Sequence, residues 1–111
     1  MVTETTRIEE ELAQAQKAQA SGNMGRARVC ARRAAGIAIR EWYKRRGGSG
    51  WDGDAMKQLQ RLQADAIAPE NVREAARRLT TVVDLDHRLP FEADPVEDAR
   101  LIISSLAKEA G

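Results

Sequence analysis

Apolar residues recur at intervals of three and four along almost the whole chain, and no strand-like alternation lasts longer than a few residues. Such spacing places apolar side chains on one face of an α-helix, whereas a strand needs a period of two. A length of 111 residues suits one domain, which we expect to span residues 1–111. The pattern therefore predicts an all-α fold, a bundle of four to five antiparallel helices.

The strongest local pattern lies at residues 24–46, which we predict to form a core helix. One half of this helix carries mostly small side chains: Ala27, Cys30, Ala31, Ala34, Ile37, Ala38 and Trp42. Basic residues fall on or near the opposite half: Arg26, Arg28, Arg32, Arg33, Arg40, Lys44 and Arg46. Small side chains let helix axes approach closely, so we expect the first half to be buried, with Cys30 acting as a small hydrophobic residue.

Capping and breaking residues predict where the other helices begin and end. The first helix should start near Thr6, which forms a capping box with Glu9, and should stop at residues 21–23. Residues 47–50, Gly-Gly-Ser-Gly, should form a flexible linker between the second and third helices. Further helices are expected at 52–66 or 54–66, at 69–81, and from an Asp94-Pro95 start onward.

Charge balance and cysteine content narrow the class of protein. Lys and Arg number 18 against 17 Asp and Glu, which gives a net charge of +1. A lone cysteine excludes an intrachain disulfide and favours a reducing, cytoplasmic location. No apolar run approaches the ~20 residues that a membrane helix needs. Acidic residues are dispersed and no His/Cys group exists, so we expect no metal, no cofactor and no membrane association.

The basic residues are nevertheless concentrated, because residues 24–46 hold eight of them and one acid. Arginine matches phosphate oxygens bidentately, so Arg26, Arg33, Arg40 and Lys44 are candidate contacts for RNA or a nucleotide. The alternative is that these side chains pair with acidic residues of neighbouring helices or of a second subunit. Overall neutrality favours that alternative, since nucleic-acid binders usually carry a basic excess.

Two residues outside the predicted helices are further candidates. His87, the only histidine, lies between Asp86 and Arg88 and could act as a general acid or base near neutral pH. Alternatively it is a surface residue that contacts a nearby carboxylate. Trp51 follows the glycine linker, and we expect it to close one end of the core, although an aromatic loop residue can also anchor a partner.

Several segments together resemble the HEPN family. An alanine-rich first helix, a Ser-Gly-Asn break at 21–23 and a second alanine-rich run at 26–35 look like the start of such a domain. Ala-Ala-Arg-Arg-Leu at 75–79 and Asp-Ala-Arg-Leu-Ile-Ile at 98–103 resemble its closing helices. The resemblance covers most of the chain and implies a compact bundle of four or five helices, commonly a homodimer.

The same resemblance implies candidate activities. Many HEPN members are ribonucleases of toxin–antitoxin or defence systems, and others pair with a small nucleotidyltransferase. Catalytic members carry an arginine followed four to six residues later by a histidine, which points here to Arg78 and His87. Eight residues separate this pair, a departure from the family spacing that favours a non-catalytic member.

We therefore hypothesise a homodimeric, non-catalytic HEPN-like module that binds a partner protein or a nucleotide. The alternative is a metal-independent ribonuclease in which Arg78 and Arg88 hold phosphate while His87 transfers protons. A third possibility is general nucleic-acid binding through the arginines of residues 24–46, which predicts a steep dependence of affinity on salt.

Overall fold

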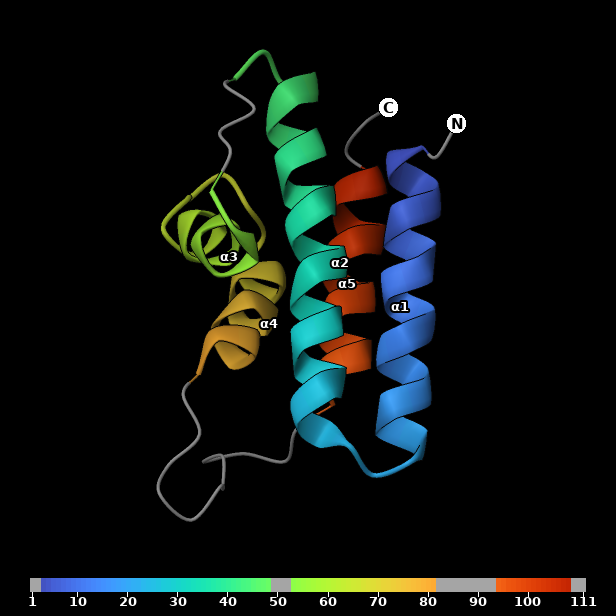
Figure 1. Cartoon of the computed structure of the whole chain (residues 1–111). Helices are drawn as coiled ribbons and strands as arrows, with labels where there is room; N and C mark the ends of the chain where they lie inside the picture. The colour runs from blue at the N-terminus through green and yellow to red at the C-terminus, as the bar shows by residue number, and fades with distance from the viewer. Residues whose placement is uncertain (1–2, 49–52, 82–93, 109–111) are drawn as a thin grey trace.

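A computed structural model describes residues 3–48, 53–81 and 94–108 of the chain. The described residues form five helices and no strand, which confirms the predicted all-α fold (Figure 1). The helices are α1 (Glu4–Ala20), α2 (Met24–Arg45), α3 (Ala55–Gln63), α4 (Glu70–Thr80) and α5 (Pro95–Lys108).

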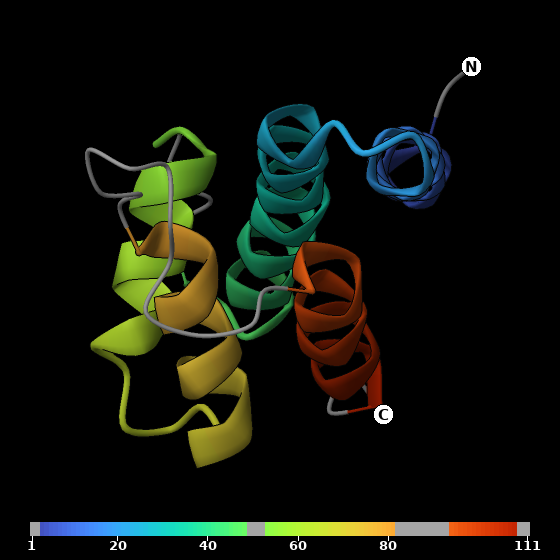
Figure 2. The same ribbon diagram turned by 90° about the horizontal axis from the view of Figure 1, so that it is seen from below.

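Helix α2 is the centre of the bundle. It packs extensively on α1, α5 and α3, and the outer helices follow one another around it in the order α1, α5, α4, α3 (Figure 2). The contact between α1 and α5 is slight, and α1 and α3 do not pack on each other at all within the described part of the chain. The ring of helices therefore has two seams, one on each side of α1.

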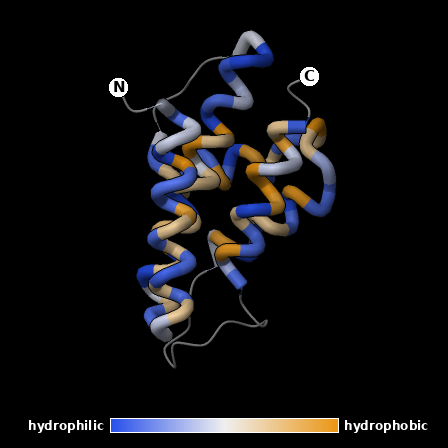
Figure 3. The backbone as a smooth tube through the Cα atoms, turned by 90° about the vertical axis from the view of Figure 1, so that its right-hand side faces the viewer, coloured by the Kyte–Doolittle hydropathy of each residue, from blue (hydrophilic) through white to orange (hydrophobic). Residues whose placement is uncertain are grey.

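The central position of α2 widens its buried surface beyond the predicted half. Besides the small residues expected inside, Ala35, Gly36, Ile39 and Tyr43 are buried, because helices pack on α2 from more than one direction. Cys30 is buried, as the sequence predicted. Larger side chains from the later helices complete the core around these small ones: Leu59, Leu62, Val72, Leu79, Ile102 and Leu106. Hydrophobic and hydrophilic residues recur along the helices, as amphipathic packing requires (Figure 3).

The helix starts are fixed by side chains that accept backbone hydrogen bonds. Asn23, Asp54 and Asp94 accept from the amides of Arg26, Lys57 and Glu97. Asp94 was predicted as a cap and Asp54 was one of two predicted starts, whereas Asn23 was predicted only as part of the break that ends the first helix. The first helix differs from prediction, because Thr3 caps it by accepting from the Thr6 amide at 3.0 Å. The predicted Thr6–Glu9 box was therefore wrong by one turn.

The later helices are shorter than predicted. Helix α3 ends at Gln63, and Ala66, expected inside, is exposed in the α3–α4 connection. Pro69 precedes α4, although the first helical position was predicted for it. Gly47 has a φ of +80° and ends α2, a conformation that favours glycine, whereas the sequence assigned it to a linker. Trp51 lies outside the described residues.

Tyr43 and Asp65 tie the α3–α4 connection to α2. The Tyr43 hydroxyl donates a hydrogen bond of 2.7 Å to Asp65 Oδ2, and the Ile67 amide donates to Asp65 Oδ1 at 2.9 Å. The first of these bonds is the larger reason why the pKa of Asp65 is lowered. Burial, with the same bond, raises the pKa of Tyr43.

We predict that Asp65→Asn reduces the acid dependence of stability. A carboxylate with a lowered folded pKa adds stability that is present above its unfolded pKa of about 3.9 and is lost as pH falls through the folded value. The free energy of unfolding of the wild type should therefore exceed that of the variant by less than about 1 kcal/mol at pH 7. Urea unfolding at stepped pH measures the difference, which should shrink below about pH 4. A difference that stays constant with pH would contradict a stabilising role of the Asp65 carboxylate. Tyr43→Phe removes the hydrogen bond to Asp65, so it should also weaken the pH dependence of the free energy of unfolding.

Candidate functional site

The basic residues of α2, which the sequence placed on or near one half of the helix, are not all exposed. Arg28 is only 5% exposed, because its guanidinium turns toward the end of α4. Its Nη2 lies 3.0–3.1 Å from the carbonyl oxygens of Arg78, Leu79 and Thr81, and Arg32 Nη1 lies 3.4 Å from the Leu79 oxygen. Burial lowers the pKa of both arginines. These two cations satisfy carbonyls at the C-terminus of α4, where the helix dipole favours positive charge.

Of the predicted phosphate contacts on α2, the structure brings Arg33 and Arg40 together. They line a pocket of about 280 Å³ at the seam between α1 and α3. We call it the arginine pocket, and its lining residues are Arg7, Glu11, Arg33, Gly36, Ile37, Arg40, Gly53, Asp54, Ala55 and Gln58. Arg7 and Glu11 were not predicted as site residues from the sequence. Their spacing of four places them on one face of α1, but the pairing of α1 with α2 was needed to locate them.

The charged groups of the arginine pocket are only partly neutralised. Glu4 accepts from Arg40 Nη2 at 3.3 Å and pairs with Arg7 Nη1 at 3.5 Å. Within the described residues, Arg33 has no ion pair or hydrogen bond, and neither Glu11 Oε2 nor Arg40 Nε has a hydrogen-bond partner although both atoms are buried. A cation and an anion thus line one cavity without neutralising each other.

The other two predicted phosphate contacts lie elsewhere. Arg26 donates to Gln14 Oε1 at 3.2 Å near the α1–α2 turn, and Lys44 pairs with Glu41 at 3.6 Å within α2. Neither residue lines the arginine pocket. Of the four predicted contacts, Arg40 alone pairs with an acidic residue of a neighbouring helix within the described chain, as the alternative interpretation of the sequence expected.

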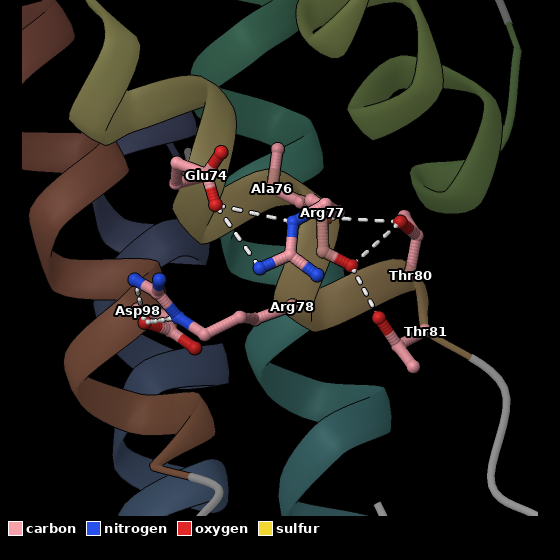
Figure 4. Close-up of polar contacts among 7 residues, drawn as sticks. All are labelled: Glu74, Ala76, Arg77, Arg78, Thr80, Thr81 and Asp98. Atoms are coloured by element: carbon pink, nitrogen blue, oxygen red, sulfur yellow. Dashed lines mark hydrogen bonds and ion pairs between the residues drawn. The ribbon is translucent and has the colours of Figure 1, made fainter. Parts of the chain in front are cut away.

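Arg78, the arginine of the predicted ribonuclease pair, is bound to α5. Its Nε and Nη2 donate to Asp98 Oδ1 at 3.0 and 2.8 Å, and Figure 4 shows the side chain reaching from α4 to that carboxylate. This hydrogen bonding raises the pKa of Arg78. The neighbouring Arg77 turns instead to Glu74 of its own helix. His87 and Arg88 lie outside the described residues, so the proposed catalytic pair stays a prediction.

The second seam, between α1 and α5, holds an apolar cavity of about 340 Å³. Its apolar lining comes from three helices, with Ile8 and Leu12 on α1, Ala38 on α2, and Ile103 and Leu106 on α5. Its polar lining is mainly acidic: Glu4, Thr5, Glu9, Glu41 and Arg45. We call it the three-helix groove. Three apolar residues of this lining are only half-buried, because α1 and α5 do not close over them: Ile8, Leu12 and Ile103.

Comparison of the chain with protein-family models, curated proteins and solved structures finds no match. In the described residues, no helix has both the length and the apolar character to cross a bilayer. The same residues contain no group of three or more His, Cys, Asp or Glu side chains placed to hold a metal ion.

Proposed function

We propose that this protein is a non-catalytic binding module that takes an amphipathic helix of a partner protein into the three-helix groove. The observation that carries the proposal is an apolar cavity between α1 and α5 whose charged lining is three glutamates and one arginine. A helix laid into such a groove buries apolar residues at spacings of three and four. Glu4 and Glu41 are already paired with cations of the chain, so Glu9, which has no ion pair among the described residues, is the glutamate that favours a partner whose apolar stripe is flanked by Lys or Arg.

The size of the groove favours a single helix over a broad protein surface. A stable protein interface usually buries about 800 Å² on each partner. Outside the groove, the large exposed hydrophobic residues of the described chain are Met24 and Val29, near the start of α2, and Ile67, in the α3–α4 connection. An apolar cavity of about 340 Å³ lined by three helices therefore matches one helix better than a wide, flat contact.

Binding of a synthetic helical peptide tests this proposal. The probe carries leucines at helical spacing over about four turns with lysine flanks, and its control keeps the leucines but has glutamate flanks. Fluorescence anisotropy should show binding of the lysine peptide and at least about tenfold weaker binding of the glutamate peptide. Equal affinity for the two peptides would contradict the acidic selection.

Variants locate the binding surface. Ile103→Glu places a charge in the apolar lining and should weaken peptide binding at least about tenfold. Ile67→Glu is the matched control, because Ile67 is 64% exposed and does not line the groove. Its affinity should equal that of the wild type. Loss of binding in both variants, or in neither, would mean that the peptide uses another surface.

The homodimer expected from the family resemblance is an alternative occupant. Light scattering distinguishes a monomer of about 12 kDa from a particle of twice that mass. A dimer that Ile103→Glu dissociates would show that a second copy fills the groove, and would overturn the partner-helix proposal. A monomer that binds the lysine peptide supports it.

The ribonuclease alternative has its own test. It predicts cleavage of mixed RNA that disappears in His87→Ala. Arg78 already donates two hydrogen bonds to Asp98, so phosphate would have to compete with that carboxylate. A folded preparation without activity on RNA would count against the alternative.

A further inference from the structure

The arginine pocket has a charge pattern that the helix-binding proposal does not use. It is separated from the three-helix groove by α1, and the two cavities share no lining residue. Arg33 and Glu11 contribute opposite charges to its wall, yet no ion pair joins them or ties either one to another described residue. Opposite charges that line one cavity without pairing are complementary to a ligand that carries both charges.

The positive side of the pocket is suited to an anionic head group. Arg40 keeps its Nε buried and without a hydrogen-bond partner among the described residues, while its Nη2 is held by Glu4. Glu4 also pairs with Arg7, so a carboxylate of the chain already rests between two of the pocket's arginines. Arginine binds carboxylates through charge-assisted hydrogen bonds, and Arg33 has no such partner in the described chain.

Glu11, the glutamate of the lining, is suited to a protonated amine. Glu11 Oε2 is buried and accepts no hydrogen bond from the described residues. The Glu11 carboxylate as a whole has no ion pair and no hydrogen bond to a described residue, so its negative charge is available to a cation that enters the cavity. Ile37 and Ala55 add apolar surface to the same lining. The volume of about 280 Å³ lies just below the range of drug-sized pockets, which suits a smaller ligand.

We infer that the arginine pocket binds a small zwitterion of the free amino acid class. The ligand's carboxylate is held by Arg33 and Arg40, and its ammonium group by Glu11. The inference stands independently of the three-helix groove, because it rests on different residues and a different ligand. It requires no chemistry on the ligand, only recognition of both of its charges.

Glycine amides allow the test to be read at the pocket itself. Gly36 and Gly53 line it, whereas Gly22 and Gly25 lie near the α1–α2 turn. NMR titration of the labelled protein with the L-amino acids at millimolar concentration should shift the Gly36 and Gly53 amides and leave Gly22 and Gly25 in place. Four further compounds complete the panel. Butyrate carries only the negative charge of an amino acid and butylamine only the positive charge, whereas inorganic phosphate and a nucleoside monophosphate test for a phosphate site.

Three variants distinguish a zwitterion site from a simple anion site. Arg33→Gln and Glu11→Gln should each weaken amino acid binding at least about tenfold, and Glu11→Gln should not weaken butyrate binding. Arg26 is an exposed arginine of α2, the helix that carries Arg33, and the Arg26→Gln protein should bind amino acids as the wild type does. Absence of shifts with every amino acid would overturn the inference. So would phosphate or nucleotide binding that exceeds amino acid binding and is insensitive to Glu11→Gln.

Discussion

Arg28→Met is expected to lower the free energy of unfolding by about 2–3 kcal/mol. Methionine retains the apolar stem of the side chain but donates no hydrogen bond. The carbonyl oxygens of Arg78, Leu79 and Thr81, which Arg28 Nη2 approaches within 3.1 Å, would lose this donor at the end of α4. Denaturant unfolding followed by circular dichroism measures the change.

The same substitution at an exposed position is the control for Arg28. Arg26 lies on the same helix and donates to the side chain of Gln14, so Arg26→Met should change stability by less than about 0.5 kcal/mol. A buried cation also carries a desolvation cost, which acts in the opposite direction. An Arg28→Met protein as stable as the wild type would show that this cost equals the gain from the three carbonyls.

Gly36→Ala should destabilise the protein by about 1–2 kcal/mol, although alanine favours helix. A Cβ at position 36 would lie 2.9 Å from Ala55 Cα and 3.0 Å from Ala55 Cβ. The first atom belongs to the backbone, so α3 would have to move away from α2. The absence of a side chain at Gly36 is what allows the two helices to come this close.

Gly25→Ala provides a matched substitution in the same helix with the opposite expected sign. A Cβ there meets only Asn23 Oδ1 at 3.9 Å, an ordinary contact. Alanine should then stabilise the protein by about 0.5–1 kcal/mol through its helix propensity. Thermal unfolding of both variants gives the signs. A stabilised Gly36→Ala protein would contradict the close approach of α2 and α3.

The helices themselves were largely predictable because their determinants are local. The spacing of apolar residues located the five helices, Asp94 marked the start of α5, and Asp54 was one of two residues expected to start α3. Thr3 was missed as a cap because Thr6 and Glu9 offered a more complete motif one turn later. Two competing caps in neighbouring turns cannot be ranked without the contacts that the first turn makes.

The candidate sites were predictable only in part, since they depend on how helices pair. A helical projection of residues 24–46 divides the helix into two halves, whereas α2 has neighbours in several directions, so Arg28 was assigned to the wrong environment. Arg33 and Arg40 were singled out by charge alone. Arg7 and Glu11, which line the same pocket, come from another helix. Both seams arise because α1 packs only slightly on α5 and not on α3 within the described chain, and no local sequence pattern encodes this.

The two seams also determine where the bundle can open at the lowest cost. Helix α1 is attached almost entirely to α2, and its fully buried residues are the small side chains Ala15 and Ala18. Detachment of this helix exposes less apolar area than opening the core around Trp42, so its local unfolding requires less free energy. Both cavities use α1 as a wall. A ligand in either one therefore stabilises the attachment of α1 to the rest of the bundle.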